Sequence, residues 1–336
     1  MTRLKIAVAG AAGGLGKTVL SQLGSMDVDI SALALNESEA SSISGLADRV
    51  IIGSVENPEV CDELVSGASA VINCAALLPN SINLGLEKFH SVNVVGALNL
   101  LNACNRSGTR KMVAISTIGV LDHTLPQNTK TLFQYRSKFL DFYTISKIEA
   151  EKILIEKSET YKLNLLVIRP GFIYGKNSLR MWLPILKQIS ARRFKIIGDG
   201  LAPFPVAYEG DLAKFISNWV VSNVQFESAQ VMIASDPFNI STLDLFSRLH
   251  KIMGSSPPGK VPVFIALPIA AIVDLLPRAL KFGPLSLLSK RRVIEYSKGY
   301  DLSGVIGENS LGYKANTSLD VGLSEMVDEF KDINSE

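Results

Sequence analysis

LKIAVAGAAGGLG, residues 4–16, is the stretch that decides the fold of this chain. Residues 4–9 form a short, mainly apolar run of the kind that makes a buried parallel strand. The run leads directly into glycines, and residues 17–23 then follow a helical pattern. A strand, a glycine turn and a helix in this order are the context that a dinucleotide-binding turn requires.

Each glycine of this turn has a distinct expected task. Gly10 permits the tight bend, Gly13 lets a pyrophosphate approach the backbone, and Gly16 lets the helix pack on the strand. Phosphates would face the start of the helix at Gly14 and Leu15, where free N–H groups and the helix dipole favour an anion. The spacing is G-x-x-G-x-x-G. A glycine-rich turn that binds nothing is the alternative interpretation.

Apolar runs and helical patterns continue to alternate as far as residue 175. The expected strands are 30–35, 50–53, 70–76, 111–116 and 165–169, and the expected helices are 57–66, 89–107 and 142–161. Strands that alternate with helices predict an α/β fold, here a Rossmann-type doubly wound parallel sheet over residues 1–175.

The pattern changes after residue 175. Prolines and loops multiply, helices become fewer and the alternation stops. Residues 176–336 are therefore expected to form a smaller C-terminal substrate lobe over the carboxyl edge of the sheet. Some of its segments should return to the Rossmann domain.

The composition limits which class of protein this chain can be and which kinds of partner it can bind. The chain has 336 residues, 47% of them hydrophobic and 20% charged, which is typical of a globular protein. A net charge of +2 gives no argument for nucleic-acid binding. The three cysteines share no motif spacing, the three histidines are scattered, and no apolar run is long enough to span a bilayer. We expect a cytoplasmic protein without a metal site, with a small-molecule substrate and a homodimer as one possible assembly.

The tip of the second strand bears on the form of the nucleotide. An acidic residue there usually binds the ribose 2′-hydroxyl, and a basic residue accommodates a 2′-phosphate. Neither stands at the tip itself. Glu37 could accept ribose hydrogen bonds, whereas Asn36, Ser38 and Lys17 could hold a phosphate. The sequence evidence for NAD and for NADP is therefore nearly equal, with a slight preference for NADP as the cofactor.

Two further strand ends should border the same crevice. The fourth strand runs into Cys74, Ala75 and Ala76, whose small side chains leave room for a ligand above the sheet. The fifth strand ends in Ser116 and Thr117, whose hydroxyls should face the cofactor. The alternative is that these hydroxyls only cap the following helix.

Tyr143 and Lys147 lie on the expected helix 142–161. Positions i and i+4 share one face of a helix, so both side chains should point the same way. An ammonium group next to a phenol lowers the pKa of the phenol, and such a tyrosine can exchange a proton near neutral pH. The alternative is an exposed helix on which both residues are solvated.

The most apolar segment of the second half is VPVFIALPIAAIVDLLP, residues 261–277. We expect a buried helix that roofs an apolar substrate pocket. A membrane patch that does not span the bilayer, or a partner surface, is the less favoured alternative, because such helices combine apolar and basic faces. The basic residues that follow are Arg278, Lys281, Lys290, Arg291 and Arg292.

Together these motifs resemble the extended short-chain dehydrogenase/reductase superfamily, in order and over nearly the whole chain. The matching positions are the glycines 10, 13 and 16, the segments 73–76, 93–99, 115–117 and 169–175, Tyr143 with Lys147, and 210–213. The apolar segment is most similar to the branch of 3β-hydroxysteroid dehydrogenase-like reductases, whose substrates are hydrophobic. The departures are Ser54, where an aspartate usually follows the third strand, and the absence of a base in 201–207.

The resemblance implies an NAD(P)-dependent oxidoreductase that transfers a hydride between the nicotinamide and an alcohol or ketone. Tyr143 would be the acid and base, Lys147 would hold the nicotinamide ribose, and Thr117 or Ser116 would donate to the substrate oxygen. Asn93 would support its helix. The other positions that the resemblance places at the cofactor are Val55, Pro170, Gly171 and Ile173. A nucleotide-sugar epimerase or dehydratase and a non-catalytic nucleotide-binding scaffold remain as alternatives.

Overall fold

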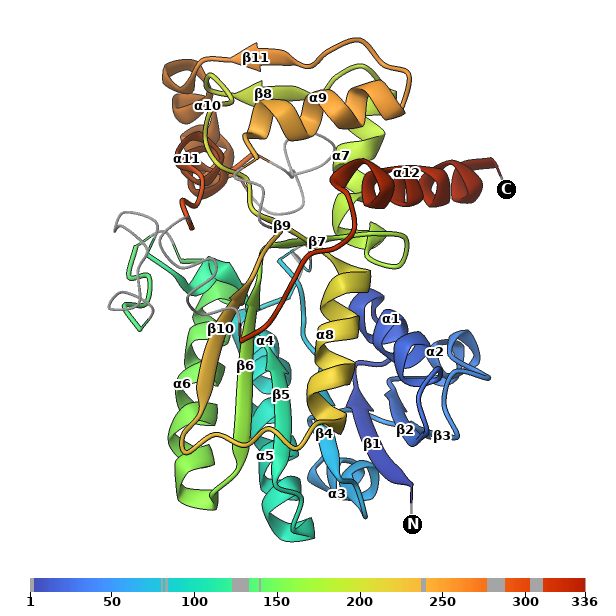
Figure 1. Cartoon of the computed structure of the whole chain (residues 1–336). Coiled ribbons are helices and arrows are strands. Elements are labelled where there is room, and N and C mark those ends of the chain that lie inside the picture. Colours follow the sequence, from blue (N-terminus) through green and yellow to red (C-terminus); the bar gives the residue numbers. More distant parts are fainter. Residues whose placement is uncertain are drawn as a thin grey trace.

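The computed structural model describes residues 3–79, 81, 84–122, 133–138, 140–236, 240–276, 288–302 and 311–335. The chain forms a seven-stranded parallel sheet with helices on both faces, and a second lobe lies beyond the carboxyl ends of the strands (Figure 1). The strand order is β10-β6-β5-β4-β1-β2-β3. The expected α/β, doubly wound parallel sheet is confirmed.

Six of the seven strands of the large sheet lie close to the positions that the apolar runs predict, whereas the seventh, β10 (Gln230–Ala234), was not expected from the sequence. The strands of the large sheet are β1 (Leu4–Ala9), β2 (Val28–Ala34), β3 (Arg49–Ile52), β4 (Ala70–Asn73), β5 (Lys111–Ile115), β6 (Asn164–Pro170) and β10 (Gln230–Ala234). Two small parallel pairs complete the described strands: β7 (Phe172–Tyr174) with β9 (Val206–Tyr208), and β8 (Lys195–Ile197) with β11 (Gly259–Val261).

Helices occur throughout the described chain. Those of the first half are α1 (Gly14–Leu23), α2 (Glu37–Ser42), α3 (Pro58–Val65), α4 (Leu86–His90), the π-helical turn η1 (Ser91–Val95), α5 (Gly96–Ser107), the 3₁₀ turn η2 (Ile118–Val120) and α6 (Phe142–Tyr161). Those of the second half are α7 (Leu179–Ser190), α8 (Glu209–Val221), α9 (Thr242–Ile252), α10 (Val263–Leu275), α11 (Lys290–Lys298) and α12 (Leu319–Ser335). The expectation that helices become fewer after residue 175 is therefore wrong.

The sheet is buried on both faces, as a parallel sheet requires. Successive side chains of a strand point to opposite faces, so Ile6 and Val8 of β1 pack in one core while Ala7 and Ala9 pack in the other. The first core is closed by α1 and α8, and the second by α3, α5 and α6. This sandwich aligns the carboxyl ends of the strands at one edge, below the second lobe.

Segments from the second half of the chain complete the sheet. β10 pairs in parallel with β6, and α8 packs against α1. Residue 175 is thus not a clean boundary in space, because the chain leaves the sheet after β6 and returns to it. The second lobe has its own core, to which α7, α9, α12 and Phe204 contribute. The three helices lie together in this lobe (Figure 1).

Two helices differ from their expected form. The helix expected over 89–107 is interrupted by the π-helical turn η1, which carries Asn93. Such turns occur often at functional sites. The segment 261–277 forms α10 as far as Leu275, but Ile265 and Ile269 are 44% and 45% exposed, so the expected buried helix is wrong. Arg278 and Lys281 lie outside the described residues. No helix among the described residues is long and apolar enough to cross a bilayer.

Gly16 gives a direct test of the turn that organises the sheet. A Cβ there would overlap the carbonyl oxygen of Gly10. We expect Gly16→Ala to lower the free energy of unfolding by about 1–3 kcal/mol, because α1 must shift away from β1. The matched control is Gly24→Ala, where the nearest atom would lie 3.4 Å away. Urea denaturation of both variants is the measurement, and equal midpoints for the two would contradict the close approach.

Candidate active site

The glycine turn between β1 and α1 leaves no space for side chains. Gly10 has a φ of +70°, and a Cβ there would come within 2.5 Å of the backbone nitrogen of Ala75. At Gly14 a Cβ would lie 2.5 Å from the carbonyl oxygen of Asn177. Gly13 is exposed at the N-cap of α1, and Leu15 is buried behind it. The turn thus offers bare backbone N–H groups at a helix start, which is the arrangement that binds a phosphate.

The end of β4 lies directly beside this turn. Cys74 donates its backbone N–H to the carbonyl of Ala9 at 2.9 Å, and Ala75 donates to the Asn73 side chain at 3.0 Å. Cys74, Ala75 and Ala76 are half-buried. Burial raises the pKa of the Cys74 thiol to about 12, so this cysteine is a neutral, small side chain at the edge of the sheet.

Thr117 and Tyr143 meet at the end of β5. Thr117 caps η2 by accepting the backbone N–H of Gly119 at 3.0 Å, and its side chain is also hydrogen-bonded to that of Tyr143. α6 begins at Phe142 because Asp141 accepts the backbone N–H of Thr144 at 2.7 Å. This cap sets Tyr143 in the first turn of the helix, opposite the strand end.

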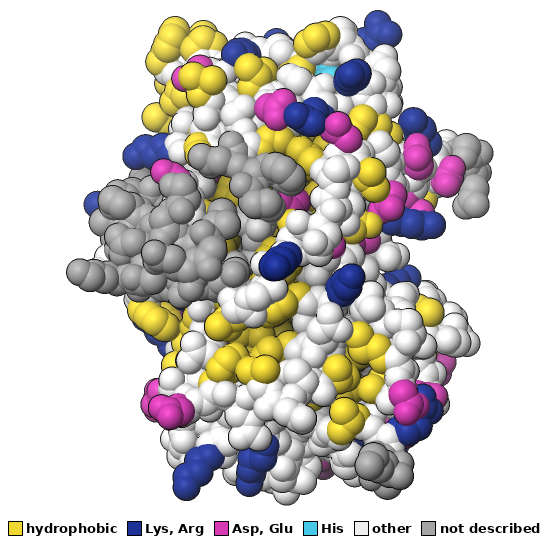
Figure 2. Space-filling view, viewed as in Figure 1, with side chains coloured by type: hydrophobic (Ala, Val, Ile, Leu, Met, Phe, Trp, Pro, Cys, Tyr) yellow, Lys and Arg dark blue, Asp and Glu magenta, His cyan; other side chains and the backbone are white. Residues whose placement is uncertain are grey.

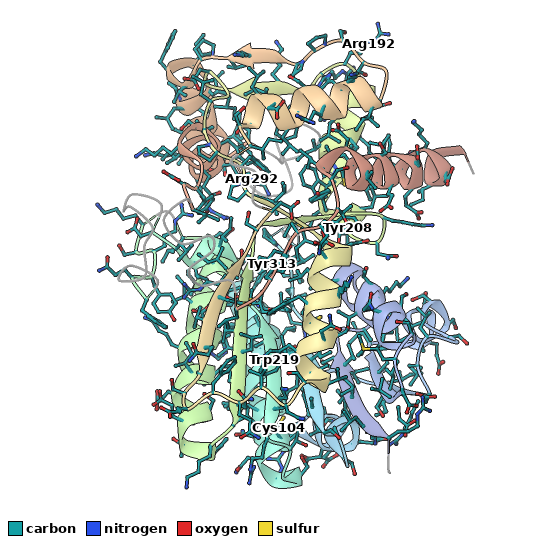
Figure 3. The ribbon with its side chains drawn as sticks, viewed as in Figure 1. Cys104, Arg192, Tyr208, Trp219, Arg292 and Tyr313 are labelled. Carbon is teal, nitrogen blue, oxygen red and sulfur yellow. The ribbon has the colours of Figure 1, made fainter. Side chains whose placement is uncertain are left out.

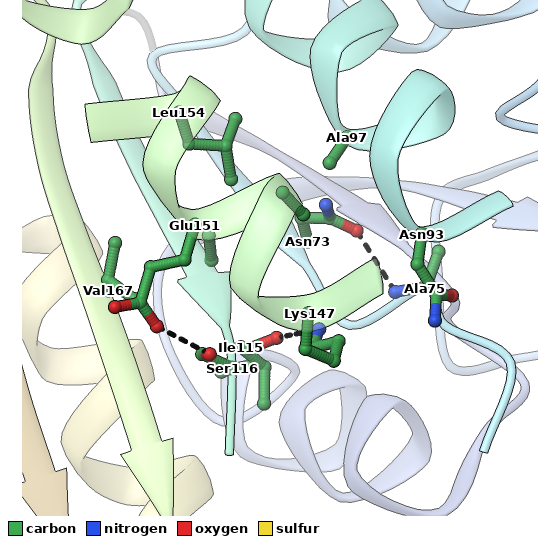
Figure 4. Close-up of a pocket in the computed structure, with 12 residues that line it drawn as sticks. Asn73, Ala75, Asn93, Ala97, Ile115, Ser116, Lys147, Glu151, Leu154 and Val167 are labelled. Carbon is green, nitrogen blue, oxygen red and sulfur yellow. Dashed lines mark hydrogen bonds between the residues drawn. The ribbon is translucent and has the colours of Figure 1, made fainter. Parts of the chain in front are cut away.

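Ser116 points to a different place from Thr117. Its hydroxyl donates to Glu151 at 2.6 Å and it is 7% exposed (Figure 4). Successive residues of an extended strand face opposite sides, so only one of the two hydroxyls can reach Tyr143. Of the two candidates from the sequence, Thr117 is the one beside the tyrosine.

Lys147 reaches the same strand end from α6. Its ammonium group donates to the carbonyl oxygen of Ile115 at 2.5 Å (Figure 4). Burial lowers the pKa of Lys147 to about 8, and the negative charge of Glu151 opposes this shift. Tyr143 and Lys147 therefore both face β5 from one side of the helix, as their i, i+4 spacing requires.

The expected lowering of the tyrosine pKa is not found. Burial raises the pKa of Tyr143 to about 12, although the hydrogen bond with Thr117 lowers it. Burial removes the water that would stabilise the phenolate, and the neighbouring groups do not make up for this loss. The ammonium group of Lys147 donates to the carbonyl of Ile115 instead. At neutral pH Tyr143 is a neutral phenol.

Glu151 is a buried charged residue beside the candidate site that the sequence analysis did not single out. It is 2% exposed and forms a buried ion pair with Arg169, which is fully buried. Its carboxylate also accepts the hydroxyl of Tyr135 at 2.9 Å, besides that of Ser116. The sequence signal was present, since Glu151 lies four residues after Lys147 and hence on the same helical face. This pair fixes α6 to β6 and to the end of β5.

Asn93 connects η1 to the site. Its side chain accepts the backbone N–H of Leu77 at 2.7 Å and donates to the hydroxyl of Ser146 at 2.9 Å. The residue is 2% exposed. It therefore holds the loop after β4 against α6, between Tyr143 and Lys147.

A second set of charged residues, in part buried, joins the chain before α6 and the cap of α6 to the lobe. Arg136 donates to Glu295 of α11 at 2.5 Å, and Tyr300 donates to the same carboxylate at 2.9 Å. Arg291 pairs with both Glu295 and Asp141, the cap of α6. Although burial raises the pKa of Glu295, the charges of Arg291 and Arg136 hold it below its usual value. The start of α6 is thus tied to α11.

A carboxylate, that of Glu39, lies at the tip of β2, where the sequence analysis found none. Asn36 caps α2 by accepting the backbone N–H of Glu39 at 3.0 Å. Glu39 folds back and accepts the backbone N–H of Leu35 at 2.9 Å. An Asn followed three residues later by Glu is a capping pattern, so this placement could have been read from the sequence. Glu37 lies exposed in the same first turn.

The remaining candidate residues occupy the other strand ends. Pro170 ends β6, and Gly171 packs so tightly that a Cβ would lie 2.7 Å from the carbonyl oxygen of Pro205. Ile173 is half-buried in β7 and accepts the indole N–H of Trp182 at 2.8 Å. Val55 is 5% exposed, and its carbonyl accepts the side chain of Asn99 at 2.9 Å. All of these follow strands of the parallel sheet or pack against its edge.

Comparison with known proteins gives a family and several named relatives. The model of the NAD dependent epimerase/dehydratase family matches residues 6–232. A 3β-hydroxysteroid-dehydrogenase/decarboxylase (isoform 2) of Arabidopsis thaliana is 26% identical over 288 residues, which are 80% of this chain and 50% of that protein. The chain thus spans half the length of that relative.

Two further matches cover nearly the whole chain. The 4-hydroxy-2-methyl-3-oxo-4-farnesyl-3,4-dihydroquinoline-1-oxide ketoreductase of Stigmatella aurantiaca is 24% identical over 324 residues, 95% of this chain and 94% of that protein. The crystal structure of UDP-glucuronic acid 4-epimerase from Bacillus cereus with UDP-glucuronic acid and NAD superposes with a TM-score of 0.73. At 20% identity, covering 98% of this chain and 100% of the other, it shows the shared fold.

The buried carboxylate gives a prediction on stability. Glu151→Gln keeps the size of the side chain but leaves the charge of Arg169 buried without its counter-ion. We expect the free energy of unfolding to fall by about 3–5 kcal/mol. The matched control is Glu149→Gln on the same helix, whose partner is the half-exposed His90 and whose loss should cost about 1 kcal/mol or less. Urea midpoints compare the two, and a Glu151 variant as stable as the control would refute the role of the pair.

Proposed function

We propose that this chain, which belongs to the NAD-dependent epimerase/dehydratase family, is an NAD(P)-dependent oxidoreductase acting on an apolar alcohol or ketone. The observation that carries the proposal is the convergence of Thr117, Tyr143 and Lys147 at the end of β5. A proton donor, a hydroxyl and an ammonium group at one strand end suit a reaction in which a carbon–oxygen group changes its charge.

The residues around the turn fit a dinucleotide. Gly13 leaves backbone exposed at the start of α1, and the side chains after β4 are small. These groups would hold the pyrophosphate, and Lys147 would hold the ribose of the nicotinamide. When bound, the nicotinamide supplies or accepts the hydride.

The protein would supply the proton and the position of the substrate. Because Tyr143 is a neutral phenol at neutral pH, it is in the form that donates a proton to a carbonyl oxygen. Thr117 would donate a hydrogen bond to the same oxygen as negative charge develops on it. In the direction of alcohol oxidation the phenolate would have to form first, so that direction should gain from high pH.

Apolar surroundings support an apolar substrate. Ile118 directly follows Thr117 and packs with Leu121, Ile233 and Phe172. The two relatives named above act, by their names, on a hydroxysteroid and on a farnesylated quinoline. A compound with a large hydrocarbon portion would suit a site beside this apolar cluster.

The nucleotide-sugar alternative shares the same catalytic residues, and no observation favours it. Such a substrate needs positive charge for its pyrophosphate, and the stretch around Phe204 has no base. Phe204 instead stacks on Phe172 with ring centroids 4.4 Å apart and is 4% exposed in the core of the lobe. The scaffold alternative does not explain why the three site residues meet.

Tyr143→Phe tests the reaction. Loss of the hydroxyl removes the proton donor and leaves the nucleotide turn intact, so we expect turnover to fall by about 10²–10⁴-fold with unchanged nucleotide binding. The measurement is kcat with a panel of apolar ketones, together with nucleotide titration. Tyr161→Phe at the other end of α6, where the hydroxyl contacts Asn102, is the matched control. Near-normal turnover of Tyr143→Phe would remove this residue from the mechanism.

We infer that the carboxylate of Glu39 selects the form of the nucleotide. At the tip of β2 it would accept ribose hydroxyls and repel a 2′-phosphate, so we propose NAD rather than the slightly preferred NADP of the sequence analysis. Glu39→Gln retains an acceptor for Leu35 and removes the charge. We expect wild-type protein to bind NAD at least tenfold tighter than NADP, about 1.4 kcal/mol, and Glu39→Gln to narrow the ratio.

Fluorescence titration of both nucleotides measures this ratio. Glu37→Gln, which changes an exposed carboxylate in the same helical turn, is the matched control and should leave the ratio nearer to that of the wild type. Tighter binding of NADP by the wild-type protein would overturn the proposal.

A further inference from the structure

Helix α10 has its large side chains on the outside. Exposed fractions are 77% for Phe264, 44% for Ile265, 45% for Ile269, 63% for Ile272 and 85% for Leu275. These positions recur every three to four residues and so form one face of the helix. Single exposed apolar residues are ordinary, but a continuous apolar face of this kind marks an interaction surface.

The buried positions of α10 are small residues. Ala266, Ala270 and Val273 are buried, and the two alanines pack with Val293 of α11 and Ile197 of β8, beside the partly buried Leu267. A helix that served only the core of the lobe would bury its Phe, Ile and Leu side chains, because burial of these groups stabilises most. The arrangement indicates that the large side chains of α10 contact a partner outside this chain.

The apolar face carries almost no polar groups. Asp274 is the only charged residue of α10, and its carboxylate accepts the backbone N–H of Lys290 at 2.9 Å, next to the start of α11. With 13 residues, α10 is too short to span a bilayer, which needs about 20. It is long enough to lie in the plane of an interface.

Hydrophobic side chains gather at the upper left of the lobe, where α10 lies, and Lys and Arg side chains occur nearby (Figure 2). Lys260 precedes α10 in β11, Lys195 lies on the paired strand β8, and Lys290 begins α11. Arg192, in the turn before β8, lies at the other end of the lobe and does not belong to this border (Figure 3). Among the residues that the structure describes, none of the three lysines forms an ion pair with a carboxylate. An apolar face with a basic border matches an anionic lipid surface.

We propose that this end of the lobe docks on an anionic membrane surface, with α10 lying in the interface and the basic residues contacting lipid phosphates. A second copy of the chain fits less well, because two basic borders would then face each other. Docking would also reach the active site, since α11 packs on α10 and is tied through Arg291 to Asp141 at the start of α6.

Vesicle flotation with the full chain tests the proposal. Wild-type protein should float with vesicles that contain phosphatidylglycerol and far less with pure phosphatidylcholine. Binding should fall as salt is raised, because screening shortens the reach of the lysine charges. Phe264→Ser with Leu275→Ser should reduce binding at least tenfold. These two side chains are almost fully exposed, so the fold should be retained, and circular dichroism checks this.

Two matched controls separate the membrane face from general effects. Val321→Ser with Ile333→Ser removes exposed apolar side chains from α12 and should leave flotation unchanged. Lys195→Gln with Lys260→Gln should weaken binding to anionic vesicles, whereas Lys214→Gln with Lys162→Gln, on the Rossmann side, should not. Failure of the wild type to bind anionic vesicles at low salt would overturn the proposal. A second result would also overturn it: the wild type forms a dimer in light scattering, Phe264→Ser with Leu275→Ser dissociates this dimer, and the wild type binds no vesicles. A second copy of the chain would then cover the apolar face.

Discussion

The buried ion pair of Glu151 and Arg169 is the interaction on which the site depends. Two charges without access to water are costly unless each finds its counter-ion and further hydrogen bonds. Here the carboxylate also accepts the hydroxyls of Ser116 and Tyr135. The geometry that satisfies all of these groups leaves α6 only one position against β5 and β6. Because Tyr143 and Lys147 stand on the same helix, their positions follow from that fit.

The same constraint distinguishes two adjacent hydroxyls. Ser116 has a structural role, because its hydroxyl donates to the buried carboxylate of Glu151, whereas Thr117 is hydrogen-bonded to Tyr143. Burial raises the pKa of Tyr143 by more than the hydrogen bond with Thr117 lowers it, so the phenol keeps its proton at neutral pH. This state suits reduction of a carbonyl group and shows why a phenol next to a lysine is not always an acidic phenol. What decides the pKa is where the ammonium group points.

The second lobe connects this site to the outer surface. Ion pairs join α11 to Arg136 before α6 and to Asp141 at the cap of α6, and α11 in turn supports α10. The helix that was expected to roof a pocket instead presents its large apolar side chains outward. An apolar substrate and an apolar surface are compatible, since an enzyme that acts on lipid-like molecules gains from proximity to the phase that holds them.

The sequence by itself determined six of the seven strands of the parallel sheet, most of their ends within one or two residues, together with the glycine turn and the helix that carries Tyr143 and Lys147. These features follow from local periodicity and from the steric freedom of glycine, both of which can be read along the chain. Only the tertiary structure decided that β10 completes the sheet, that Thr117 rather than Ser116 meets the tyrosine, and that α10 is exposed. Each of these depends on which side of an element faces a partner distant in sequence. Hydrophobicity alone does not distinguish an apolar helix face that is buried in the protein from one that is exposed.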